Sequence, residues 1–150
     1  MYELTANENT YVLPEDSNDI LAEVLPANNT LRVAWEVLES EEKSGYLISA
    51  VRRLEDLNYK GDKVWYHQPL KFPRIARGIP LVFDDAPTEV KRAQVLWAAY
   101  IMRDELFILR RNVEACVALG IIQGDIQSSD EPPKKVLELL HRWLTSWRRI

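Results

Sequence analysis

The sequence is poor in the side chains that bind metals or form disulfide bonds. It has a single cysteine, Cys116, and two histidines, His67 and His141, which lie far apart in the chain. One cysteine excludes an intramolecular disulfide framework and any zinc site with two or more thiolates, and it favours an intracellular protein. No metal-binding histidine spacing, phosphate-binding glycine loop or nucleophile-elbow motif is present. The sequence therefore predicts a protein that is not an enzyme and that needs no cofactor.

Long hydrophobic runs are also absent. The longest apolar run, Val95–Met102, has eight residues, whereas a membrane-spanning helix needs about 18 or more. The first residues are acidic and polar, which predicts no secretory signal. We therefore expect no membrane partner.

Positive charge is scarce in the first third of the chain. Residues 1–50 hold ten acids and two bases, a net charge of −8, whereas residues 51–150 hold 17 bases and 13 acids, a net charge of +4. The overall charge of −4 argues against a dedicated duplex-DNA-binding domain, which is usually strongly basic. The asymmetry instead predicts two surfaces of opposite sign on one molecule.

The hydrophobic pattern predicts a mainly α-helical fold, a small bundle around a long central helix. Apolar spacing and capping residues predict helices over 14–25, from an N-cap at Ser40 to about Leu57, from Pro87 to about Arg110, and over 134–147, with a short amphipathic turn at 31–38. The long helix is apolar nearly all round, as is typical of a buried central helix. Two glycines among aliphatic residues favour a β-hairpin over 113–127.

A Ser- and Pro-rich segment at 128–133 separates the last predicted helix from the rest. The sequence therefore predicts a helical core over 1–130 and an appended amphipathic helix over 131–150. Trp143 and Trp147 lie one turn apart on this helix and are followed by Arg148 and Arg149. Core packing and docking in a partner's groove explain this pattern about equally well.

Residues 58–85 form a proline-rich stretch without a helical pattern. A loop of this length is uncommon in a compact domain, and its aromatic content predicts that it folds against the rest of the protein. Aromatic and basic side chains alternate in it, as they do in surfaces that stack single-stranded nucleic acid; they are Trp65, Tyr66, Lys71, Phe72, Arg74 and Arg77. The alternative is that the aromatics pack inward, and the acidic first third favours this alternative or a protein contact.

Two smaller features also have two interpretations. His67 has no nucleophile or carboxylate at a useful spacing, so a loop histidine is favoured over a general base. The pair Asp84 and Asp85 could bind a metal, but a helix cap explains it with fewer assumptions.

Four motifs occur in order within residues 9–105. They are Ala50-x-x-Arg53-Leu54, Tyr59-Lys60-Gly61, Gln68-Pro69-Leu70-Lys71-Phe72-Pro73-Arg74, and Ala86-Pro87-x-x-Val90-Lys91-x-Ala93 at the start of the long helix. With them, the chain resembles the head–tail connector proteins of tailed bacteriophages, also called adaptor or head-completion proteins. Related sequences are often labelled DnaT-like single-strand DNA-binding proteins.

The resemblance implies a structural virion protein without catalytic residues. Such proteins form a ring beneath the portal, usually matching its twelve-fold symmetry, and extend the DNA channel to the tail. The implied partners are further copies of the chain, the portal protein and the next neck or tail-completion protein, with viral duplex DNA passing through without sequence-specific binding. The implied location is the virion neck, and the host cytoplasm during assembly. A single-stranded DNA-binding accessory protein is the alternative.

A ring needs two different faces of the subunit to meet, and the charge asymmetry suggests which ones. The acidic candidates for this interface are Glu36, Glu39, Glu41 and Glu42, and the basic candidates are Arg52, Arg53, Lys71, Arg74 and Arg77. The family-motif loop is formed by Gln68, Pro69, Leu70, Phe72, Pro73 and Arg74. The candidates for portal docking are Trp143, Trp147, Arg148 and Arg149.

Overall fold

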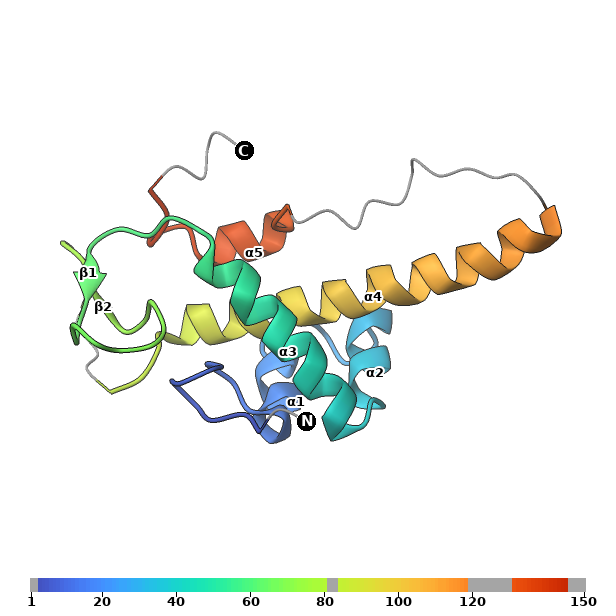
Figure 1. Cartoon of the computed structure of the whole chain (residues 1–150), viewed down its shortest axis with the longest axis horizontal. Coiled ribbons are helices and arrows are strands. Elements are labelled where there is room, and N and C mark those ends of the chain that lie inside the picture. Colours follow the sequence, from blue (N-terminus) through green and yellow to red (C-terminus); the bar gives the residue numbers. More distant parts are fainter. Residues whose placement is uncertain (1–2, 81–83, 119–130, 146–150) are drawn as a thin grey trace.

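The computed structural model describes residues 3–80, 84–118 and 131–145, with only the backbone for 107–118. Its elements in chain order are α1 (Pro14–Ala22), α2 (Thr30–Glu36), α3 (Ser40–Glu55), β1 (Asp62–Lys63), β2 (Arg74–Ile75), α4 (Thr88–Ala118) and α5 (Lys134–Leu139). The fold is mainly α-helical, as predicted, and the four other helices pack around α4 (Figure 1).

The central helix is α4, which has 31 residues. Its stretch from Val95 to Ala99 is buried, and so is Met102, because α1, α2, α3 and α5 all contact this helix. The C-terminal part of α4 continues past the other helices (Figure 1). The predicted hairpin over 113–127 is wrong for 113–118, which are helical, and 119–127 lie outside the described residues. Extending an existing helix costs far less than starting a new element, and this outweighs the β preference of valine.

The three N-terminal helices begin at recognisable capping residues. Pro14 is the first residue of α1, which ends at Ala22, three residues earlier than predicted. The predicted turn at 31–38 is a seven-residue helix, α2, because Asn29 Oδ1 accepts hydrogen bonds from the N–H groups of Leu31 (2.9 Å) and Arg32 (3.2 Å). The expected N-cap of α3, Ser40, is instead its first helical residue.

The N-cap of α3 is Glu39. Its backbone N–H donates to Glu42 Oε1 at 3.3 Å, so a carboxylate in the first turn satisfies the donor that precedes the helix. This contact moves the start of α3 one residue upstream of the prediction.

A buried amide joins the N-terminal segment to α3 and α4. Gln94 is fully buried on α4, and its Oε1 accepts from the N–H of Tyr11 at 3.0 Å. Its Nε2 donates to Thr10 Oγ1 (2.7 Å) and to the carbonyl of Leu47 (3.0 Å). All three partners are buried polar groups, so each would lose its hydrogen bond if the amide were removed.

Replacing Gln94 with alanine should therefore destabilise the whole protein. We expect Gln94→Ala to lower the free energy of unfolding by about 3 kcal/mol, because it creates a cavity and leaves buried polar groups unsatisfied. Chemical denaturation measures this change. The control is Arg103→Ala, an exposed position on the same helix, which should change stability by less than about 0.5 kcal/mol. Equal effects of the two substitutions would contradict the role given to Gln94.

The C-terminal segment packs on the same core as the rest of the chain. The helix predicted over 134–147 ends at Leu139 as α5, and the chain then turns so that Trp143 is only 1% exposed. The Trp143 ring packs edge-on against Phe72 with centroids 5.0 Å apart. The backbone beyond α5 is fixed by hydrogen bonds from Lys60 N–H to the Trp143 carbonyl (2.7 Å) and from Thr145 N–H to the Asn58 carbonyl (3.2 Å). These long-range contacts override the helical pattern.

Glu89 ties this segment to the start of α4. Its Oε2 accepts hydrogen bonds from Arg142 Nε and from Trp143 Nε1, the latter at 3.0 Å. Burial alone would raise the pKa of Glu89, but the hydrogen bond from Arg142, a backbone hydrogen bond, the Arg142 charge and the Trp143 N–H together lower it. The ionised form is therefore favoured in the folded protein.

This lowered pKa predicts a pH dependence of stability. The contribution is complete above the ordinary glutamate pKa of 4.5 and is lost as the pH falls through the lower pKa of the folded state. Below pH 4.5, the urea midpoint of the wild type should thus fall more steeply than that of Glu89→Gln. The control is Glu138→Gln, an exposed carboxylate on α5, which should keep the wild-type slope. Parallel curves for the wild type and Glu89→Gln would exclude this linkage.

Candidate functional site

The proline-rich loop forms a small hairpin at one end of the molecule (Figure 1). Strands β1 and β2 pair antiparallel, with Asp62 opposite Ile75 and Lys63 opposite Arg74. Gly61 precedes β1 with a φ of 78°, and a Cβ atom there would lie 1.9 Å from the Ile75 carbonyl oxygen. Only glycine fits this close approach. The structure thus contains a hairpin, but in the segment that the sequence predicted to be a loop.

Two polar side chains hold the loop between the strands. Gln68 accepts from the Trp65 N–H (2.9 Å) and donates to the carbonyls of Leu70 and Pro73 (2.8 Å each). Arg74 donates to the carbonyls of Lys60, Lys71 and Gly61. Both residues belong to the family-motif loop, and both satisfy backbone groups.

Three apolar residues of this motif, Leu70, Phe72 and Pro73, are buried, whereas Pro69 is exposed. Phe72 is 1% exposed and packs edge-on against the rings of Tyr11, Tyr59 and Trp143. The Tyr11 hydroxyl accepts from the Phe72 N–H and donates to Glu55. Burial, more than the nearby Glu55 carboxylate, raises the pKa of Tyr11, so this hydroxyl keeps its proton.

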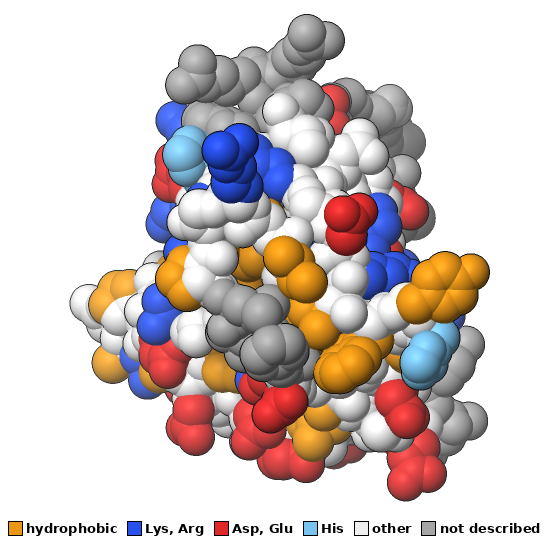
Figure 2. All heavy atoms as spheres, turned by 90° about the vertical axis from the view of Figure 1, so that its left-hand side faces the viewer, with side chains coloured by type: hydrophobic (Ala, Val, Ile, Leu, Met, Phe, Trp, Pro, Cys, Tyr) orange, Lys and Arg blue, Asp and Glu red, His pale blue; other side chains and the backbone are white. Residues whose placement is uncertain are grey.

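The part of the hairpin that faces solvent is aromatic. We call residues 64–67 the hairpin tip. In it, Trp65 is 54% exposed and Tyr66 is 97% exposed, and the neighbouring strand residue Ile75 is also exposed. Figure 2 shows hydrophobic side chains over this end of the molecule and acidic side chains along its lower edge. The tip is a surface of the type that anchors binding partners.

The structure separates the residues predicted to stack nucleic acid. Phe72 is buried, Lys71 Nζ donates to the Leu57 carbonyl at 2.9 Å, and Arg74 binds backbone carbonyls. Trp65, Tyr66 and Arg77 remain exposed. The prediction that the aromatics pack inward is therefore right for Phe72 and Tyr59 and wrong for the two residues of the tip.

The residues predicted for a charged interface are also only partly at the surface. Lys71 and Arg74 are half-buried and make the intramolecular bonds just described. Arg52 and Arg77 are exposed and Arg53 is half-buried. On the acidic side, Glu36 pairs with Arg32 at 3.1 Å, Glu42 supports the start of α3, and Glu39 and Glu41 are exposed.

One of the residues predicted for portal docking lies in the core. Trp143 is buried, where it contacts Phe72 and Glu89. Trp147, Arg148 and Arg149 lie outside the described residues.

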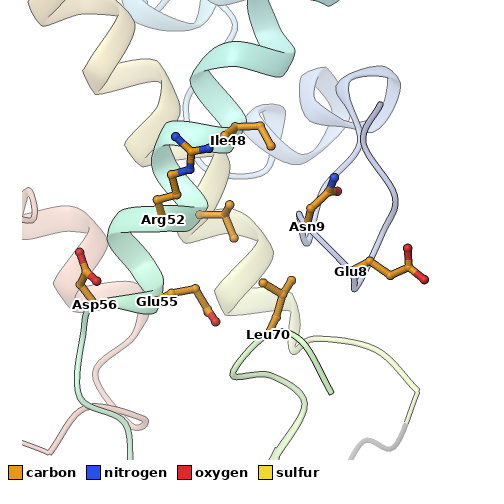
Figure 3. Close-up of a pocket in the computed structure, with 8 residues that line it drawn as sticks. Glu8, Asn9, Ile48, Arg52, Glu55, Asp56 and Leu70 are labelled. Carbon is orange, nitrogen blue, oxygen red and sulfur yellow. The ribbon is translucent and has the colours of Figure 1, made fainter. Parts of the chain in front are cut away.

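A groove that the sequence did not predict lies beside α3 (Figure 3). We call it the α3 groove. It has a volume of about 440 Å³ and is lined by Glu8, Asn9, Ile48, Val51, Arg52, Glu55, Asp56 and Leu70. These residues come from the N-terminal segment, α3 and the hairpin loop. No spacing in the sequence connects three such distant segments, which explains why no pattern indicated the groove.

The part of the chain that the structure describes contains neither a candidate metal site nor a helix that could span a membrane. No group of three or more potential ligand side chains there could hold a metal ion. No helix within the described residues has the length and apolar character to cross a membrane. Of the Asp84–Asp85 pair, Asp85 serves the start of α4, since it accepts from the Ala86 N–H (2.9 Å) and forms an ion pair with Lys91.

Comparison with known proteins identifies the family. A family model described as "Putative DnaT-like ssDNA binding protein" matches residues 3–132. The chain belongs to this family. The family is one of binding proteins and not an enzyme family, and the match spans α1 to α4 and ends just before α5. No curated protein and no solved structure matches the chain.

In this DnaT-like protein, Gln68 should control the rigidity of the hairpin loop. We expect Gln68→Ala to accelerate amide hydrogen exchange of residues 64–73 by about tenfold, because three hydrogen bonds within the loop are lost. Exchange in α3 and α4 should stay unchanged. The control is His67→Ala, an exposed neighbour, and exchange that is equally fast in both variants would show that Gln68 does not brace the loop.

Proposed function

We propose that this protein is a structural, non-catalytic head–tail connector that assembles as a ring beneath the portal of a tailed bacteriophage. The proposal starts from the resemblance carried by the four sequence motifs. The ring would extend the DNA channel, and its partners would be the portal protein and the next protein of the neck.

The proposal depends most on the role that the motif from Gln68 to Arg74 has in the structure. Gln68 and Arg74 satisfy backbone carbonyls, and Phe72 fills the core. The motif therefore builds a braced hairpin that presents an aromatic tip, as expected of an assembly protein whose contacts must be preformed. A nucleic-acid platform would need these same side chains at the surface.

Binding of single-stranded DNA is the second candidate. The family description favours it, and so do the exposed rings of Trp65 and Tyr66 with exposed Lys63 beside them. Exposed Lys60 and Arg77 could add phosphate contacts, whereas Lys71, Phe72 and Arg74 are used within the molecule.

The two candidates predict different partners. We expect the chain to bind the portal protein encoded by the same genome and to form twelve-fold rings on it, visible by electron microscopy. In the same buffer, a fluorescent oligothymidine should show no binding at micromolar protein. The second candidate predicts micromolar or tighter binding, with log affinity falling by about 0.7 per phosphate contact for each log unit of salt. Strong oligothymidine binding without portal rings would reject the connector function.

Two obvious truncation and charge-reversal tests need to be avoided. Deleting residues 132–150 would remove Val136, Leu140 and Trp143 from the core, so loss of portal binding would report misfolding. Reversing the charge of Arg74 would break its bonds to three carbonyls. Arg77→Glu is the better charge-reversal variant, because this side chain is exposed.

A further inference from the structure

We propose that the hairpin tip of one copy inserts into the α3 groove of the next copy, and that this contact repeats around the assembly. The inference deepens the connector function proposed above and rests on it for the closed ring. Both surfaces lie on the same chain and they differ from each other, which is the geometry of a heterologous contact.

The tip has the properties of a preformed anchor. Tyr66 and Trp65 project from a loop whose backbone is held by Gln68, so little conformational entropy is lost when the rings become buried. Both side chains also carry a polar donor, the Tyr66 hydroxyl and the Trp65 indole N–H, which need acceptors when buried.

The α3 groove offers matching partners for such a side chain. Ile48, Val51 and Leu70 provide an apolar lining. Of the three acids around it, Glu55 already accepts from the Tyr11 hydroxyl and the Lys71 N–H, so exposed Glu8 and Asp56 are the acceptors for a partner. Its volume of about 440 Å³ falls within the range of pockets that hold small organic groups. An aromatic ring with a hydroxyl or N–H donor fits this combination of lining and acceptors.

Charge complementarity points to a second copy as the occupant. Residues 60–77, which contain the tip, hold five bases and one acid, whereas the groove presents three acids and one base, Arg52. The tip of the same copy does not fill the groove, because Tyr66 is 97% exposed. The three acids would repel the phosphates of a nucleic acid at this position.

Zero-length crosslinking tests the contact directly. A carbodiimide joins a lysine amine only to a carboxylate that touches it, so it should link Lys60 or Lys63 of one copy to Glu8 or Asp56 of another. Mixing isotope-labelled and unlabelled full-length chains before crosslinking identifies links between copies by mass spectrometry. We expect mixed-isotope links between these segments, both for the chain at high concentration and for the chain assembled on portal. Their absence in both samples overturns the proposal.

Substitutions give a second, independent test. The double variant Trp65→Ala/Tyr66→Ala should weaken self-association by about tenfold or more, because buried aromatic anchors dominate such contacts. The variants Lys60→Glu and Glu8→Lys/Asp56→Lys should each weaken it, and their combination should restore it, whereas Lys63 is left unchanged because its Nζ donates to the Gln68 carbonyl. The matched control is Val37→Ala, an exposed apolar residue at the C-cap of α2, which should have no effect.

The outcomes separate this contact from the connector function. Rings of Trp65→Ala/Tyr66→Ala that assemble on portal like the wild type would reject the contact and leave the connector function standing. Crosslinked copies that never bind portal would support the contact between copies and reject the connector function. Loss of oligothymidine binding in the tip variant, with self-association unchanged, would assign the tip to nucleic acid and overturn the proposal.

Discussion

The buried amide of Gln94 is the contact on which the rest of the structure depends. It fixes the backbone of Tyr11 against α4 and α3, and the Tyr11 hydroxyl then receives the N–H of Phe72 at 3.2 Å. Phe72 in turn packs on Trp143. One buried side chain on the central helix therefore positions both the hairpin and the C-terminal segment. The core thus anchors the hairpin at Phe72, and Gln68 braces the loop that carries the tip.

Sequence patterns were sufficient wherever local contacts decide the structure. Local signals gave the first residues of α1, α3 and α4 to within one residue, whereas α4 continues eight residues past its predicted end at Arg110. Sequence patterns failed where a contact between distant residues decides where an element ends. Trp143 fits a helical stripe, but its ring meets Phe72, 71 residues earlier in the chain, and the helix ends so that this contact can form. No local spacing contains that information.

The number of charged residues in the sequence likewise does not show which of them face solvent at the candidate site. Lys71 and Arg74 carry the same formal charge as Arg77, yet the first two bind backbone carbonyls and the third faces solvent. A sequence gives the sign of a charge but not whether a carbonyl lies within reach. The high aromatic content did predict a folded loop, but only the structure distinguishes buried Phe72 from the exposed tip.

The charge asymmetry of the chain weighs the two functions against each other. A single strand bound at the tip would place its phosphates on a molecule with an overall net charge of −4, whose first 50 residues carry −8, so long-range repulsion would oppose its binding most strongly at low salt. A second copy meets the opposite situation, since its acidic α3 groove approaches a hairpin region with a net charge of +4. Each such contact leaves one acidic and one basic surface unused at the two ends of the pair. In the proposed ring, these two surfaces would meet only when the ring closes, so the charge asymmetry would favour a closed assembly over an open one.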